Sequence, residues 1–186
     1  IIKGSPREAG NSALLAQQVA EGAQAAGAQV DSFYLHGMDI SPCDACDACH
    51  AEPYRGCIVD DDMQVIYPKL LDADAIVIAS PVYWFTVSAQ TKLYMDRCYA
   101  LVDAQGYLLR GKEIGIVMTY GDSDPFDSGA VNALRTFQDG FNYVSARIAG
   151  MVYGSSDAPG DIAENADVMA RAYALGLKLG AGEQAL

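Results

Sequence analysis

The sequence predicts an α/β fold in which a doubly wound, five-stranded parallel sheet carries helices on both faces. Apolar stretches of strand length alternate with stretches in which apolar residues recur every three to four positions, and each crossover must return over the sheet. A chain of 186 residues that is 51% hydrophobic can bury one core but is short for two ordinary domains. We therefore expect residues 1–186 to form a single domain.

The first part of the chain predicts a strand, a helix and a second strand. Residues 1–2 are apolar and a glycine turn follows at once, so we expect them to end a strand that begins before the given sequence. Apolar residues at helical spacing predict a helix over residues 11–27, which Gly27 ends. Residues 28–35 have the composition and length of a strand.

In the middle of the chain, a long loop interrupts the alternation of strands and helices. A cysteine-rich loop occupies about residues 36–59, and a helical pattern begins near Asp61. The run DAIVIAS at residues 74–80 is apolar and β-branched, as in a central parallel strand covered on both faces, and Pro81 is expected to end it. A helix over residues 88–102 follows.

The last part of the chain completes the pattern. Residues 113–120 form another apolar strand run, and a polar loop follows it at residues 121–128. The remaining elements are a helix at 130–141, a strand at 146–153 and a helix at 162–179. Ligands of such sheets bind outside the carboxyl ends of the strands, so the loops after the first, third and fourth strands are the candidate site.

The charge of the chain excludes several kinds of partner. A formal net charge of −12 and a pI near 4.3 oppose binding to nucleic acid or to anionic membranes. No apolar run reaches the roughly 18 residues that a spanning helix needs, and no secretory signal pattern is present. We expect a cytoplasmic protein.

The loop after the first strand has the composition of a phosphate site. It reads Gly-Ser-Pro-Arg-Glu-Ala-Gly-Asn-Ser and enters the first helix, where free amide N–H groups favour an anion. Ser5, Arg7, Asn11 and Ser12 supply donors that match phosphate oxygens. Because the spacing fits neither the Walker loop nor the dinucleotide pattern, a monophosphate is favoured. The alternative is that Asn11 or Ser12 only caps the helix and Arg7 is solvated.

The loop after the third strand contains three consecutive aromatic residues. It begins Pro81, Val82, and continues with Tyr83, Trp84 and Phe85. Exposed aromatic side chains in a loop suit a planar ligand or a partner subunit. Core or dimer contacts are an equal alternative for Trp84 and Phe85.

Gly-Ser-Pro-Arg followed by Gly-Asn-Ser, together with the Pro-x-Tyr segment, resembles the NADPH-dependent FMN reductase family, a flavodoxin-like group. The resemblance implies a sheet of order 2-1-3-4-5, an FMN phosphate in the first loop, and the isoalloxazine ring against residues 81–85. It also implies flavin contacts from Thr119 and Gly121 after the fourth strand. No side chain is assigned a catalytic role, because the flavin carries the chemistry.

The four clustered cysteines are the sharpest local motif. Cys43, Cys46, Cys49 and Cys57 have two-residue gaps followed by a longer one, and four thiolates can hold a [4Fe-4S] cluster. The motif resembles that of iron–sulfur flavoproteins. Zinc, or free thiols and disulfides, are the alternatives. His50, beside the third cysteine, is expected to be solvated surface.

Three further features, two of them charged and one a cysteine, are expected to have structural roles. Lys92 and Asp96 are four residues apart and are expected to pair on a helix. Residues 60–62, three consecutive aspartates, are expected to cap a helix, and Cys98 is expected to pack as a small buried hydrophobe.

Three functions remain open at this point. The first is an FMN-dependent oxidoreductase that takes electrons from NAD(P)H and passes them to a flavin, quinone or other acceptor. The second is an iron–sulfur flavoprotein that carries electrons between a [4Fe-4S] cluster, FMN and ferredoxin. The third is a zinc-stabilised interaction module without redox chemistry. The resemblance also implies a homodimer or homotetramer.

Overall fold

The computed structural model describes residues 1–182, so the last four residues of the predicted domain, 183–186, lie outside the described part. The main sheet is parallel and has the order β2-β1-β3-β7-β8, with one further short strand, β4, paired to β3. Numbered along the chain, the five parallel strands follow the predicted order 2-1-3-4-5. They are β1 (Ile2–Lys3), β2 (Phe33–Tyr34), β3 (Ala75–Tyr83), β7 (Glu113–Tyr120) and β8 (Arg147–Ser155).

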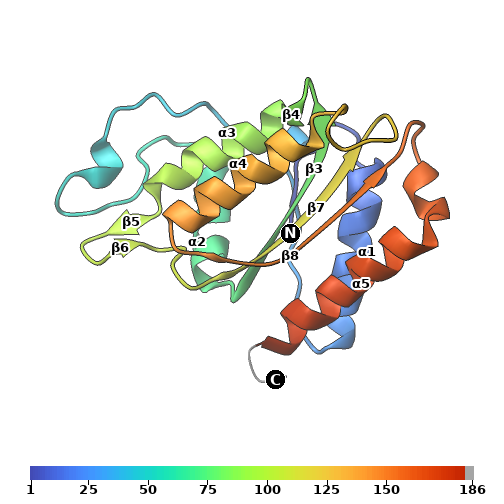
Figure 1. The fold of residues 1–186 in the computed structure, drawn as a ribbon. Helices are drawn as coiled ribbons and strands as arrows, with labels where there is room; N and C mark the ends of the chain where they lie inside the picture. The colour runs from blue at the N-terminus through green and yellow to red at the C-terminus, as the bar shows by residue number, and fades with distance from the viewer. Residues whose placement is uncertain (183–186) are drawn as a thin grey trace.

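Helices cover both faces of the sheet, as predicted (Figure 1). One face packs against α1 (Asn11–Ala25) and α5 (Ala166–Ala181). The other packs against α2 (Met63–Asp72), α3 (Ala89–Arg97) and α4 (Ala130–Tyr143). None of the helices within residues 1–182 combines the length and apolar character that crossing a membrane requires.

The two central strands are mainly apolar because each face of the sheet is buried, with polar residues such as Ser80 and Thr119 towards their carboxyl ends. In β3, Val77 and Ala79 join the core beneath α1 and α5, whereas Ile76 and Ile78 join the core on the opposite side. Alternate side chains of a strand point to opposite faces, so a sheet covered twice needs apolar residues at every position. The predicted bounds of β7, 113–120, are confirmed residue by residue.

Two predicted strands differ most in their bounds, and a third, predicted at 146–153, is observed as β8 at 147–155. The strand predicted at 28–35 is reduced to Phe33–Tyr34, because its only neighbour, β1, offers just two residues for pairing. Pro81 does not end β3: it still pairs in register with Thr119 of β7. The strand then continues because Val82 and Tyr83 pair with β4 (Thr86–Val87) in an antiparallel hairpin.

The helix predicted at 88–102 ends at residue 97, although the apolar pattern continues to residue 102. Ser88 caps α3 by accepting a hydrogen bond from the amide of Thr91, and the helix ends at Arg97. A 3-10 turn at Cys98–Ala100 follows, and then an unpredicted hairpin of β5 (Val102–Asp103) and β6 (Gly106–Tyr107). Similarly, α5 begins at Ala166, after a 3-10 turn at Asp161–Glu164.

Helices α1 and α5 approach closely enough that their backbones meet through glycine. A Cβ atom added to Gly176 would lie 2.1 Å from the carbonyl oxygen of Val19, and one added to Gly22 would lie 2.1 Å from that of Tyr173. Neither neighbour is a flexible side-chain end, so a larger residue would force the helices apart.

We expect Gly176→Ala to lower the free energy of unfolding by about 1–3 kcal/mol, because overpacking displaces backbone. Gly140→Ala is the matched control: its Cβ would meet only Met95 Cε at 3.9 Å, and alanine favours an exposed helical position. Thermal or urea unfolding should therefore show opposite signs for the two variants. Equal stability of Gly176→Ala and the parent would contradict the packing argument.

Candidate functional site

The loop after β1 is fastened to the neighbouring strand and helix. The amide of Gly4 donates to the carbonyl oxygen of Ala79 at 2.8 Å, and the hydroxyl of Ser88 donates to the carbonyl oxygen of Gly4 at 2.6 Å. A Cβ atom at Gly4 would lie 1.9 Å from Thr91 Oγ1, so only glycine fits there. The loop is thus held in one conformation before any ligand arrives.

The predicted phosphate donors are gathered where this loop enters α1. Ser5 is buried and accepts a hydrogen bond from the amide of Arg7 at 3.0 Å, whereas the Arg7 side chain is exposed. Ser12 is buried in the first turn of α1, which contains no acidic residue. The helix end therefore presents free amides, with the Arg7 guanidinium nearby and no acidic residue in the first turn.

The capping interpretation of Asn11 and Ser12 is wrong. Gly10 occupies the N-cap position, and no side chain caps the helix. Asn11 is already helical, and its amide reaches across to the loop after β8: Nδ2 donates to the carbonyl oxygen of Ala158 at 2.9 Å, and Oδ1 accepts from the amide of Gly160 at 2.7 Å. Asn11 thus connects the loop after β1 to the loop after β8.

The aromatic segment forms a two-residue hairpin turn between β3 and β4. Tyr83 pairs with Thr86, so Trp84 and Phe85 are the two central residues, and their φ angles are +48° and +65°. Such turns favour Asn-Gly, and each non-glycine residue at positive φ carries strain of about 1–3 kcal/mol. The Trp84 side chain is nevertheless 92% exposed. The fold holds a large aromatic group in solvent at an energetic cost.

Helix α4 supports this turn from behind. A Cβ atom on Gly129 would lie 2.5 Å from Phe85 Cα, and Asn132 Nδ2 donates to the Phe85 carbonyl oxygen at 3.2 Å. The aromatic turn is therefore a fixed element.

The loop after β7 is the third loop at this end of the sheet. Thr119 is buried, and no atom lies near the position that a Cβ of Gly121 would take, so its backbone is open to a ligand. Asp122 has φ +68° and its carbonyl accepts from the Ser155 hydroxyl. Phe126 is exposed in the same loop. The loops after β1, β3 and β7 lie together at one end of the sheet, at the top of Figure 1; we call this end the carboxyl edge.

The cysteine motif lies apart from the carboxyl edge, in the long loop at the left of Figure 1. Cys43, Cys46, Cys49 and Cys57 all belong to the lining of one hollow of about 20 Å³, which we call the cysteine hollow; the first two are exposed and Cys49 is buried. Burial raises the pKa of the Cys49 thiol, and the three neighbouring thiols act in the same direction. Across residues 1–182, no three His, Cys, Asp or Glu side chains are already arranged to coordinate one metal ion.

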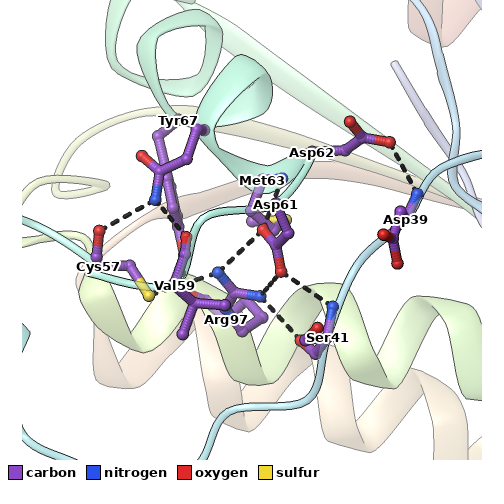
Figure 2. A network of polar contacts seen from close by, with 10 residues as sticks. Asp39, Ser41, Cys57, Val59, Asp61, Asp62, Met63, Tyr67 and Arg97 are labelled. Carbon is purple, nitrogen blue, oxygen red and sulfur yellow. Dashed lines mark hydrogen bonds and ion pairs between the residues drawn. The ribbon is translucent and has the colours of Figure 1, made fainter.

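A buried ion pair that the sequence did not reveal borders the cysteine hollow. Arg97 pairs with Asp61, and their side chains are 0% and 3% exposed (Figure 2). Burial alone would raise the pKa of the Asp61 carboxyl, but hydrogen bonds from Arg97 and from the amides of Ser41 and Met63 hold it below its ordinary value. Asp61 accepts a hydrogen bond from the amide of Met63 at the start of α2 and neutralises a buried guanidinium. The expected cap is otherwise absent: Asp62 occupies the N-cap position, but its side chain accepts from the amide of Asp39 and does not cap the helix.

The remaining predictions about charged and sulfur-containing residues have mixed outcomes. Lys92 and Asp96 pair at 2.6 Å, as expected. His50 is partly exposed at the surface, where its ring stacks on the exposed Tyr99 with centroids 4.2 Å apart and Nε2 lies 3.2 Å from the Tyr99 carbonyl oxygen. Cys98 is partly buried against the core, and burial raises the pKa of its thiol to about 12.

A larger cavity of about 610 Å³ lies between α3, α4, the β5–β6 hairpin and the cysteine loop. Its walls are mainly aromatic and aliphatic, and no lysine or arginine lines it. Cys43 and Tyr99 belong to the linings of both this cavity and the cysteine hollow.

Comparison with known proteins gives consistent results. The sequence model of the NADPH-dependent FMN reductase family matches residues 1–164. An iron-sulfur flavoprotein of Archaeoglobus fulgidus is 38% identical over 73% of this chain and 68% of its own length. A putative NAD(P)H-dependent FMN-containing oxidoreductase of Bacillus subtilis, YwqN, is 26% identical over 94% of both chains.

Among solved structures, the NAD(P)H:quinone oxidoreductase of Methanothermobacter marburgensis superposes with a TM-score of 0.75, covering 96% of both chains at 17% identity. At that identity the likeness shows the fold alone. Matches to four iron-sulfur flavoproteins span between 56% and 68% of those proteins' lengths.

The strained turn generates a stability prediction. In ligand-free protein, we expect the double variant Trp84→Asn/Phe85→Gly to have a free energy of unfolding about 1 kcal/mol higher than that of the parent, because both new residues suit positive φ. Thermal unfolding should show this as a higher midpoint temperature. Phe126→Ala, which removes another exposed ring from the neighbouring loop, should leave stability unchanged. A destabilised double variant would show that the aromatic side chains support the fold.

Proposed function

The chain belongs to the NADPH-dependent FMN reductase family, and from this membership we propose that it is a flavin-dependent oxidoreductase that binds FMN at the carboxyl edge. The observation that carries the proposal is the convergence of a monophosphate-type loop and a fixed aromatic turn at one end of the sheet. A site with these two parts suits a planar ring system attached to a phosphate.

Each part of the carboxyl edge has a role in this proposal. The amides at the start of α1, with Ser5, Arg7 and Ser12, bind the FMN phosphate, while Asn11 fixes the loop through residues 158 and 160. Residues 81–85 lie against the ring, and the open backbone at Gly121 approaches its polar side. Bound FMN would supply the electron-accepting chemistry, and the chain orients it and shields it from water.

The electron donor and acceptor are part of the proposal as well. A reduced nicotinamide is the donor that the family description names, and a flavin or quinone is the acceptor class. The exposed Trp84 ring, held outward by a strained turn, suits contact with a second subunit that completes the pocket. A homodimer or homotetramer is therefore expected; a monomeric mass in light scattering would contradict it.

A second candidate function is favoured by the cysteine hollow. Four thiols around one hollow are the donor set of a [4Fe-4S] cluster, and the sequence relatives include proteins named iron-sulfur flavoproteins. In this candidate, Cys43, Cys46, Cys49 and Cys57 hold the cluster, and the protein carries electrons between ferredoxin and FMN. Family membership favours either redox function over a zinc-stabilised module without redox chemistry.

The first experiment is an absorption spectrum of protein purified without oxygen, followed by iron and acid-labile sulfide assays. Flavin bands with about four irons per chain support the cluster-containing carrier. Flavin bands without iron support the reductase alone, and absence of flavin after FMN addition would overturn the main proposal. Steady oxidation of NADH or NADPH by the pure protein with a quinone acceptor favours the reductase, whereas reduction only through ferredoxin favours the carrier.

The phosphate loop gives a sharper prediction. Arg7→Gln should weaken FMN binding about tenfold, because it removes a charge-assisted contact worth about 1.5 kcal/mol. The affinity for riboflavin, which lacks the phosphate, should not change. Titration of flavin fluorescence measures both, with Arg171→Gln on α5 as a surface control. Equal losses for FMN and riboflavin would place Arg7 outside a phosphate site.

A further inference from the structure

The two ends of the cysteine loop are held by one side chain. Where the loop begins, Arg97 Nη1 donates to the carbonyl oxygen of Ser41 at 2.8 Å, two residues before Cys43. The amide of Ser41 donates to Asp61 Oδ2 at 2.9 Å. The Arg97–Asp61 ion pair therefore binds both the backbone N–H and the backbone carbonyl of Ser41 (Figure 2).

Where the loop ends, the same guanidinium contacts the last cysteine. Arg97 Nη2 donates to Cys57 Sγ at 3.4 Å and to Asp61 Oδ1 at 3.2 Å. Gln64, on the first turn of α2, fixes the backbone beyond it by donating to the carbonyl oxygens of Cys57 and Val59. Cys57 is therefore oriented by a hydrogen bond to its sulfur and by one to its carbonyl.

Hydrophobic packing alone does not explain this arrangement. Burying two charges costs several kcal/mol of desolvation for each ion, and apolar residues of similar size often serve stability equally well. The Nε–H of Arg97 is also buried and has no acceptor among the described residues, although Arg97 lines the cysteine hollow. A guanidinium with an unused donor beside four thiols suits an occupant that carries acceptor sulfur atoms.

We propose that Arg97 is a positioning residue for the cysteine hollow: it fixes residues 41 and 57 relative to α3, holds Cys57 toward the other three thiols, and directs an N–H group at the Cys57 sulfur. Its effect on a reduction potential rests on the proposed cluster, whereas its effect on the loop does not. A hydrogen bond to a ligating sulfur stabilises the more electron-rich state, so Arg97 raises the potential of a bound cluster.

The test uses variants that avoid leaving a buried charge unpaired. Arg97→Met/Asp61→Asn removes both charges and keeps an oxygen acceptor for the amide of Met63, whereas Arg97→Lys keeps the charge but cannot contact Ser41, Asp61 and Cys57 together. Arg135→Met/Asp139→Asn, on an exposed pair of the same type, is the matched control. Far-UV circular dichroism of the ligand-free variants reports folding, independently of either proposed ligand.

Three measurements are made on full-length protein purified without oxygen. Relative to the parent and the control, both Arg97 variants should show a more negative midpoint potential and about 10- to 100-fold weaker retention of iron against a chelator. Amide hydrogen exchange in residues 41–57 should be faster in the metal-free variants, with exchange in β3 and β7 unchanged.

The outcomes separate this inference from the proposed function. If the parent holds no iron, the cluster proposal fails, and the exchange measurement on metal-free protein still decides whether Arg97 fixes the loop. Potential, iron retention and exchange all equal to those of the parent would overturn the inference. Should the double variant fail to fold, Arg97→Lys provides the same comparisons.

Discussion

Burial of the sheet on both faces is the constraint on which the rest of this molecule depends. Strands β3 and β7 place apolar side chains alternately beneath α1 and α5 and beneath the helices of the opposite face. Polar side chains have no place along such strands except at their ends. The chemistry of the chain is thereby confined to loops, and the parallel direction of the strands gathers three of those loops at one edge.

The chain itself offers binding and orientation more than acid–base chemistry. At the carboxyl edge the structure provides amides, hydroxyls, one exposed guanidinium and aromatic rings, a set that suits holding a cofactor. At the cysteine hollow it provides thiols and a buried guanidinium. Both sites are built from segments that hydrogen bonds to distant parts of the chain keep in place, as a preorganised binding site requires.

The sequence predicted those features that leave a local pattern. The bounds of β7 follow from an uninterrupted apolar run, and the Lys92–Asp96 pair follows from helical spacing. The Arg97–Asp61 pair joins residues 36 apart, and no periodicity signals such a contact. The positive φ angles of Trp84 and Phe85 contradict local preference, so only the neighbouring strands and α4 impose them. The β5–β6 hairpin had a weak signal in Gly106, whose φ is +113°.

Helix α3 is anchored at both of its ends. Its N-cap residue, Ser88, is hydrogen-bonded to Gly4 in the loop after β1, and its last residue, Arg97, is bonded to the cysteine loop. A helix of nine residues behaves as a short rigid rod, so it cannot shift at one end without moving the other. For the ligands proposed at its two ends, thermodynamic linkage would be reciprocal: whatever factor one ligand imposes on the affinity of the other through α3, the second must impose on the first.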